Sequence, residues 1–257
     1  IGGTTRIYSL SLSPAGPGLA ALAIPVYTGG AMTLSGTAYA SGGPVACAGL
    51  CTVSLGASFN GDVECGTILP LGTVKGTATT GVAPRALPAA SLFSTYKARG
   101  APISFASIPA GTISQKVLSP GSNPFGSTSA TGIYTVDVPA LSNLTITQTR
   151  LASTLVVDLG LNASLTITGA NLWDPPADGM PILIVRGTAL ATVTINGSLV
   201  PLAESTGGAN LNPASTPYYS ASDADTGDTY PSELHGLIHI AGSSVGTTLT
   251  ANAVLRG

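Results

Sequence analysis

The sequence is poor in charge. Only 8% of its 257 residues are Asp, Glu, Lys or Arg, against about 25% in an average globular chain. Nine basic and 11 acidic residues leave a net charge of −2. A nucleic-acid-binding surface needs a basic patch, so this balance excludes a nucleic-acid partner. Coiled coils and helical bundles are rich in Glu, Lys, Leu and Arg, so the composition excludes them as well.

Long hydrophobic runs and catalytic motifs are also missing. The longest apolar runs, Leu19–Val26 and Met180–Val185, are far shorter than the roughly 20 residues that span a bilayer. The Gly-x-Ser-x-Gly match at Gly242–Gly246 lacks the following helix and the later acid and histidine of a nucleophile elbow. We therefore expect no membrane span, no enzymatic activity and no required cofactor.

Cysteine is scarce and clustered. The three cysteines are Cys47, Cys51 and Cys65. A disulfide between Cys51 and Cys65 would close a hairpin-sized loop, and a pairing of Cys47 with Cys65 or three buried thiols are the alternatives. A zinc site would need a fourth ligand, and no histidine is near in the sequence.

What the sequence does contain is alternation. Polar and apolar residues alternate with period two in Ile7–Ser13, Ala31–Ala40, Thr52–Phe59 and Thr247–Arg256, which is typical of strands with one buried face. Gly, Pro, Asn and Ser clusters separate these runs. We therefore predict an all-β fold, an antiparallel sandwich or jelly roll of one or two domains, with one short helix near Pro88–Tyr96.

A weak internal repeat indicates an alternative fold. The segments that begin at Asn143, Ser164 and Thr192 read NLTIT, SLTITG and TVTING, at spacings of 21 and 28 residues. Coils of a β-solenoid repeat at comparable lengths. A β-solenoid in the C-terminal half is therefore the alternative to the sandwich.

The domain organisation follows from a change in composition. Residues 81–132 are rich in Pro, Gly and Ser, and long connections of this kind are uncommon inside compact domains. We expect an N-terminal β region at 1–80, a connecting segment or arm at 81–132, and a C-terminal β domain at 133–257.

The loop from Thr216 to Tyr230 holds the main candidate site. Its carboxylates Asp223, Asp225 and Asp228 partly match the alternating oxygen ligands of a calcium loop, and a solvated acidic turn is the alternative. Its rings Tyr218, Tyr219 and Tyr230 are candidate glycan contacts, and burial as loop anchors is the alternative.

Two further sets of residues carry weaker predictions. Asn143, Asn162 and Asn196 begin Asn-x-Ser/Thr sequons, which become glycosylated only in a suitable host. His235 and His239, expected on one strand, would lie about 13 Å apart, too far for one metal ion.

The outward faces of the predicted strands carry Ser and Thr instead of Lys and Glu. Lysines on edge strands commonly prevent edge-to-edge pairing, and this chain has three lysines. The pattern indicates sheets that neighbours cover, and codon bias is the alternative explanation. We expect a structural subunit of a repetitive surface assembly, most simply a virion protein such as a capsid decoration, minor capsid, tail or fibre component.

Two alternatives place the protein on a cell surface or outside the cell. An exported pilus-like filament subunit could donate the strand with Tyr8, Leu10 and Leu12 to a neighbour. A secreted carbohydrate-binding module would use the Thr216–Tyr230 loop. In the first two hypotheses the partners are copies of the chain and other assembly proteins, and in the third the partner is a surface glycan.

Overall fold

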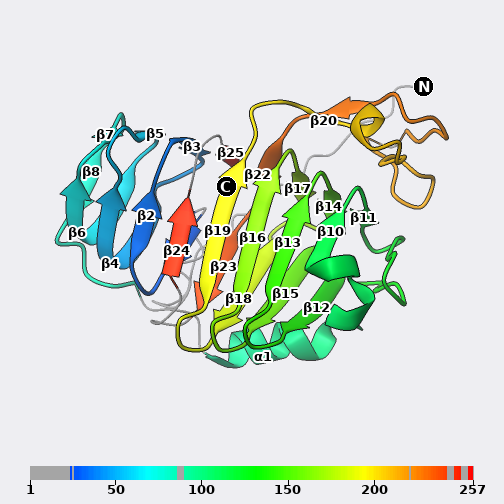
Figure 1. Cartoon of the computed structure of the whole chain (residues 1–257), viewed down its shortest axis with the longest axis horizontal. Helices are drawn as coiled ribbons and strands as arrows, with labels where there is room; N and C mark the ends of the chain where they lie inside the picture. Colours follow the sequence, from blue (N-terminus) through cyan, green and yellow to red (C-terminus); the bar gives the residue numbers. More distant parts are fainter. Residues whose placement is uncertain are drawn as a thin grey trace, which may run out of the picture.

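The fold is a parallel β-solenoid with three faces (Figure 1). The structure is a computed structural model, and it describes residues 24, 26–85, 90–219, 221–241, 246–249 and 254–256. Each coil contributes a strand to each face, and strands of successive coils pair in parallel. Because side chains alternate across a strand, half of them point into the solenoid and half point outward.

The first face lies beneath the helix. Its strands are, in spatial order, β9 (Ala101–Ile103), β12 (Ile133–Val138), β15 (Thr154–Leu159), β18 (Leu183–Gly187), β23 (Ile238–Ala241), β1 (Val26–Thr28), the first half of β4 (Val45–Val53), β6 (Val63–Pro70) and β8 (Ala78–Thr80).

The second face is turned toward the viewer in Figure 1. Its strands are β10 (Thr112–Ser114), β13 (Asn143–Thr147), β16 (Ser164–Gly169), β19 (Thr192–Gly197), β24 (Gly246–Leu249), β2 (Met32–Leu34) and the second halves of β4 and β6.

The third face closes the coils. Its strands are β11 (Val117–Leu118), β14 (Arg150–Ala152), β17 (Leu172–Asp174), β22 (Glu233–His235), β25 (Val254–Arg256), β3 (Thr37–Ser41), β5 (Ser58–Asn60) and β7 (Thr73–Val74). A separate antiparallel pair, β20 (Leu202–Ala203) with β21 (Thr229–Tyr230), belongs to an insertion. The described residues also include the short 3-10 helices η2 (Phe105–Ser107), η3 (Pro109–Gly111) and η4 (Glu204–Thr206).

The core is a stack of inward-facing apolar rows. Leu144, Leu165 and Val193 occupy equivalent positions in three successive coils, and all three are fully buried. Trp173, the single tryptophan, is also buried inside the solenoid. Each row stays out of water only while another coil or a cap covers it, so the stacking itself supplies the hydrophobic stabilisation.

The order of the coils in space differs from their order in the chain. The first described coil (β1–β3) stacks on the last one (β23–β25), with Val26 opposite Ile238, Thr33 opposite Thr248 and Tyr39 opposite Val254. The chain then runs outward through β4–β8 and returns along the solenoid to β9 (Figure 1). The first and last described coils are therefore neighbours in space.

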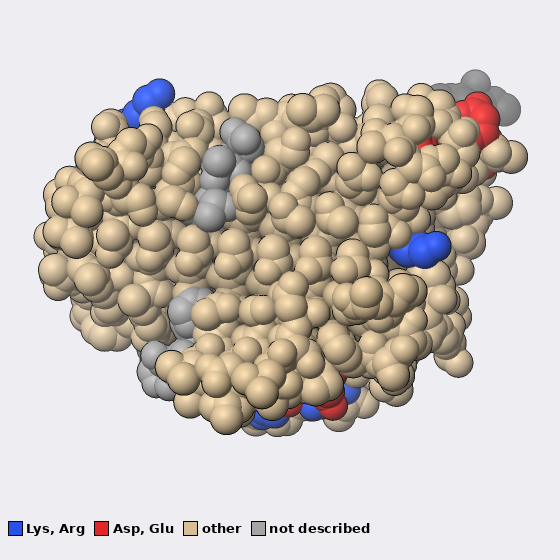
Figure 2. Space-filling view, in the orientation of Figure 1, with Lys and Arg blue, Asp and Glu red and all other residues tan. Residues whose placement is uncertain are grey.

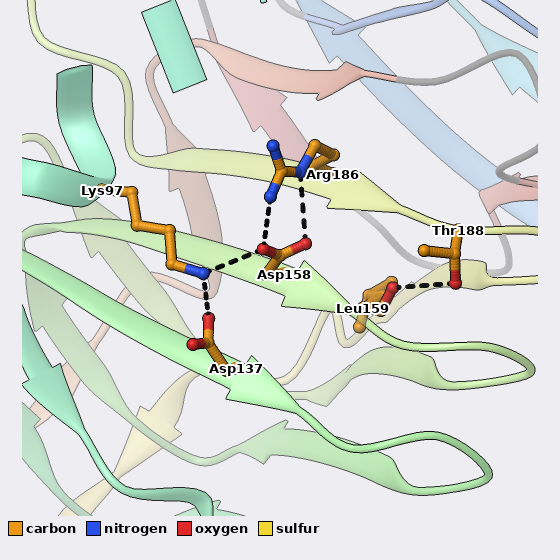
Figure 3. A network of polar contacts seen from close by, with 6 residues as sticks. All are labelled: Lys97, Asp137, Asp158, Leu159, Arg186 and Thr188. Carbon is orange, nitrogen blue, oxygen red and sulfur yellow. Dashed lines mark hydrogen bonds and ion pairs between the residues drawn. The ribbon is translucent and has the colours of Figure 1, made fainter. Parts of the chain in front are cut away.

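The returning chain contains the helix α1 (Ala90–Arg99), which lies along the first face. Phe93 is buried against Ile133, Val156 and Ile184 of three successive strands. Figure 3 shows the charged network beside it. Lys97 Nζ lies 2.6 Å from Asp137 and 2.9 Å from Asp158.

Arg186 completes this network. Its guanidinium donates two hydrogen bonds to Asp158, of 2.6 and 3.2 Å, and lies over the ring of Phe93. Burial alone would raise the pKa of Asp158, but the hydrogen bonds from Arg186 and Lys97 lower it. The ion pairs and the apolar contact together hold α1 on the coils.

The predicted antiparallel sandwich is wrong. The strands of both large sheets pair in parallel, and the three repeated segments pair in register as β13, β16 and β19. A half-buried strand has the same alternation in a sandwich and in a solenoid, so period two could not separate them. Solenoid coils also extend beyond the C-terminal half, since residues 26–80 form coils as well.

The structure also differs from the expected connecting segment and from the expected disulfide. Residues 81–132 contain α1, β9, β10 and β11, and so build the first coil of the C-terminal stack. The Cys51–Cys65 disulfide is not formed, because all three cysteines are buried free thiols and Cys65 lies opposite Cys47. Within the described residues, no helix is long and apolar enough to cross a membrane.

Candidate functional site

The candidate loop belongs to an insertion, residues 198–232, between β19 and β22. The pair β20–β21 joins its two ends, with Leu202 opposite Tyr230. An apolar cluster of Leu172, Leu202, Leu211 and Tyr230 attaches the insertion to the third face of the solenoid. The insertion is therefore packed on the coils rather than extended into solvent.

A buried carboxylate organises the insertion. Glu204 is only 1% exposed. It accepts hydrogen bonds from the backbone N–H of Leu211 (2.5 Å), the backbone N–H of Asp228 (3.1 Å) and the hydroxyl of Tyr230 (2.9 Å). Burial and the bond to Glu204 raise the pKa of Tyr230, which therefore keeps its proton as the donor.

A buried guanidinium fixes the insertion from the other side. Arg150 begins β14, and it donates to the backbone carbonyls of Leu211 and Thr216 at 2.7 Å and of Pro217 at 3.1 Å. It also lies 5.1 Å from the ring centre of Tyr218. Burial lowers the pKa of Arg150, yet the group stays charged, since its ordinary pKa is above 12.

The three tyrosines do not form one platform. Tyr230 is buried, and Tyr218 packs edge-on against it with ring centres 5.0 Å apart. Tyr219 is 87% exposed. Tyr230 and the partly buried Tyr218 thus anchor the loop, and of the three predicted glycan contacts Tyr219 is the one that is largely exposed.

The three aspartates have different hydrogen-bond partners. The side-chain amide of Asn212 donates to both Asp223 and Asp228 at 3.3 Å, whereas Asp225 accepts from the nearby backbone N–H of Gly227. Within the described ranges, no group of three or more His, Cys, Asp or Glu side chains is arranged to hold a metal ion. Calcium binding by Asp223, Asp225 and Asp228 stays a prediction.

The two histidines lie on different faces, contrary to the single strand expected for them. His235 ends β22, the chain turns at Gly236 with a φ of 135°, and His239 lies in β23. His235 Nδ1 is 3.3 Å from Asp174 and half-exposed. His239 is buried between Ile184 and Tyr27, its neighbours on adjacent strands, and burial lowers its pKa.

The remaining predicted residues are placed as follows. Asn143, Asn162 and Asn196 are all exposed, and their glycosylation stays a prediction. Tyr8, Leu10 and Leu12, the proposed assembly strand, lie outside the described residues.

The two ends of the solenoid differ, which sequence reasoning did not predict. At the β9 end, Ile103, Ile113 and Leu118 are buried. Phe105 and Phe125 pack against this end of the core. This end is therefore capped.

The opposite end is open. The inward-facing Ile68 and Val74 are only partly buried here. Leu71 is 53% exposed, and Leu69, 43% exposed, points outward opposite Thr52 of β4. Among the described residues, β8 pairs with β6 and nothing pairs with its outer edge. We call the last coil, formed by Thr67–Pro70 of β6, by β7 and by β8, the open end.

Comparison with protein-family models, with curated proteins and with solved structures finds no match to this chain.

The Glu204 network predicts the result of one substitution. Glu204→Gln places an amide where three donors converge, so at least one buried donor loses its acceptor, at a cost of about 1–3 kcal/mol. We expect a lower urea midpoint and faster proteolytic cleavage within residues 198–232. Asp225→Asn, at an exposed acid of the same loop, is the control and should change neither. Equal behaviour of the two variants would contradict the anchoring role of Glu204.

The burial of His239 predicts a pH dependence. Its pKa is lower in the folded chain than the ordinary value of about 6.5. As pH falls below that value the unfolded chain binds more protons, so stability declines from pH 7.5 to pH 5. His239→Leu should reduce this decline in melting temperature. A variant whose decline equals that of the native chain would show that His239 does not contribute.

Proposed function

We propose that the protein is a non-enzymatic structural subunit of a repetitive surface assembly, and that its copies associate through the open end of the solenoid. The observation that carries this proposal is the contrast between the two ends. One end covers its apolar rows with local helices and aromatic rings, and the other leaves apolar side chains and a strand edge without a described cover.

The chemistry of the open end favours association. An unpaired strand edge offers backbone N–H and C=O groups to another strand. The exposed leucines Leu69 and Leu71 belong to the same last coil, and Leu69 points outward opposite Thr52. β8 itself reads Ala-Thr-Thr and contains none of the charged residues that usually protect an edge. Contact between two such ends would bury the edge and the leucines together.

The setting of this assembly remains the one expected from the sequence. A virion component, such as a capsid decoration, minor capsid, tail or fibre protein, is the first form of the proposal. An exported filament on the cell surface is the alternative, and both leave the elongated solenoid sides outward. Electron microscopy of the native source distinguishes a virion from a cell filament. Calcium-dependent glycan binding by a stable monomer would instead support a secreted carbohydrate-binding module.

The proposal predicts the effect of charge at the open end. The double variant Leu69→Lys, Leu71→Lys places two like charges where copies meet, so it should remain monomeric at concentrations at which the native chain forms larger particles. The measurement is sedimentation velocity over a concentration series, with negative-stain imaging.

Leu161→Lys is the matched control, because Leu161 is a half-exposed leucine in the turn between β15 and β16, away from the open end. It should assemble like the native chain. A native chain that stays monomeric at all concentrations, or a double variant that assembles normally, would overturn the proposal.

A further inference from the structure

One rank of threonines runs along the second face of the solenoid. In register from coil to coil, its members lie directly opposite one another across seven paired strands. They are Thr112, Thr145, Thr166, Thr194, Thr248, Thr33 and Thr52. Each is partly exposed, while the residues on either side of Thr166, for example, point inward and are buried. We call this surface the threonine face.

The spacing of the rank is set by the backbone. Paired strands lie about 4.8 Å apart, so seven threonines extend over roughly 29 Å. A second rank two residues further along the strands contains Ser114, Thr147, Thr168 and Asn196. It lies about 6.6 Å from the first. The face is therefore a two-dimensional array of short polar side chains, most of them threonine, with two fixed repeats.

The array is rigid. Threonine is β-branched, which restricts χ1, and the strands are held from beneath by fully buried residues such as Ile146, Leu165 and Ile195. At its margin the amide of Asn143 hydrogen-bonds to the hydroxyls of Thr145, Ser164 and Thr166. A preorganised array loses little conformational entropy when it binds a partner.

The threonine face carries no charge. None of the strands β10, β13, β16, β19, β24 and β2 contains an Asp, Glu, Lys or Arg. In Figure 2 the middle of this view shows no blue or red residue, and one blue residue lies inside the outline toward the right. The other two faces are different. α1 and its ion pairs cover part of the first face, and the 198–232 insertion is bound to Arg150 on the third.

The lack of charged and aromatic side chains on the threonine face argues against nucleic acids, glycans and most proteins as its partners. Nucleic acids need cations, glycans are commonly gripped by aromatic rings, and protein interfaces depend on buried aromatic or Arg anchors. The threonine face has none of these groups. All the threonines of the array can make contacts at once only if the partner has a regular, uncharged surface that forms hydrogen bonds. Many weak contacts then add up to stable binding.

We infer that the threonine face binds ice. A water lattice is uncharged, offers donors and acceptors at a fixed repeat, and on the prism planes of hexagonal ice repeats at distances close to those of the two threonine ranks. Threonine hydroxyls hydrogen-bond to lattice water, and the methyl groups between them shed disordered hydration water more readily than charged side chains would.

Ice binding goes beyond the proposed assembly function and does not require it. A monomer already contains the complete rank. Leu69 continues this outward position beyond Thr52 at the open end, and the other six threonines lie farther from that end. The two proposals therefore fail independently, since one is tested by particle size and the other by the growth of ice crystals.

The test uses the purified full chain as a monomer. The native protein should shape single ice crystals, produce a freezing hysteresis and inhibit recrystallisation. Thr166→Lys places a charge at the centre of the rank and should lose most of the hysteresis while its circular dichroism and melting temperature stay native. Thr95→Lys, the same change at an exposed residue of α1, is the matched control and should retain full activity.

Direct adsorption provides a second measurement. Fluorescently labelled native protein should become incorporated into a growing ice hemisphere, and Thr166→Val, which keeps the shape but loses the hydroxyl, should be incorporated less. A native chain without hysteresis or ice shaping, or a Thr166→Lys variant as active as the native one, would overturn the inference. It would also be overturned if the face mediated dimer formation that Thr166→Lys abolishes, with no effect on ice.

Discussion

Parallel stacking of one coil on the next is the constraint on which the rest of the structure depends. Each coil is too small to bury its own apolar side chains, so rows such as Leu144, Leu165 and Val193 are buried only because the coils align in register. This requirement makes the ends of the solenoid decisive. The β9 end has a local cap, while the other end presents Leu69 and Leu71. In the middle of the solenoid, the first described coil (β1–β3) and the last one (β23–β25) cover each other.

Stacking of the coils constrains the inward-facing side chains only, so the outward-facing side chains can differ from one face of the solenoid to another. The few charges are concentrated on two of them. Lys97, Asp158 and Arg186 fix α1, and Arg150 with Glu204 anchors the 198–232 insertion. The strands β10, β13, β16, β19, β24 and β2 of the second face, which carry the threonine rank, contain no Asp, Glu, Lys or Arg. The low charge content of the chain is thus unevenly distributed, and the face without charge is the most regular one.

Much of the local structure could be predicted from the sequence, because side-chain alternation depends on short-range geometry. The similarity of the segments at Asn143, Ser164 and Thr192 is visible in the sequence, and they are three consecutive strands of one face. The strand direction could not be predicted, since alternation is the same for parallel and antiparallel partners. Nor could the stacking of Val26 on Ile238, because nothing local links residues more than 200 positions apart.

The candidate site was only partly predictable for a related reason. The Thr216–Tyr230 loop stood out by composition, and Tyr218 and Tyr230 are indeed brought together. Their partners Arg150 and Glu204 are distant in the sequence, and the sequence around a single charged residue does not show that it is buried. The sequence predicts His235 and His239 on one strand, because a glycine at a corner between two strands, such as Gly236, cannot be told from a glycine within a strand. The rank from Thr112 to Thr52 became visible only when register aligned its members.

The central claim, that the N-terminal coils stack on the C-terminal one, is tested most directly by a distance. Spin labels on Ala31→Cys and Leu161→Cys, in equivalent turns three strand steps apart, should lie about 15 Å from each other at 4.8 Å per step. The native thiols are buried. Double electron–electron resonance on the dilute monomer measures this separation. A distance near 30 Å, expected if residues 26–80 stacked ahead of β9 in chain order, would contradict the account.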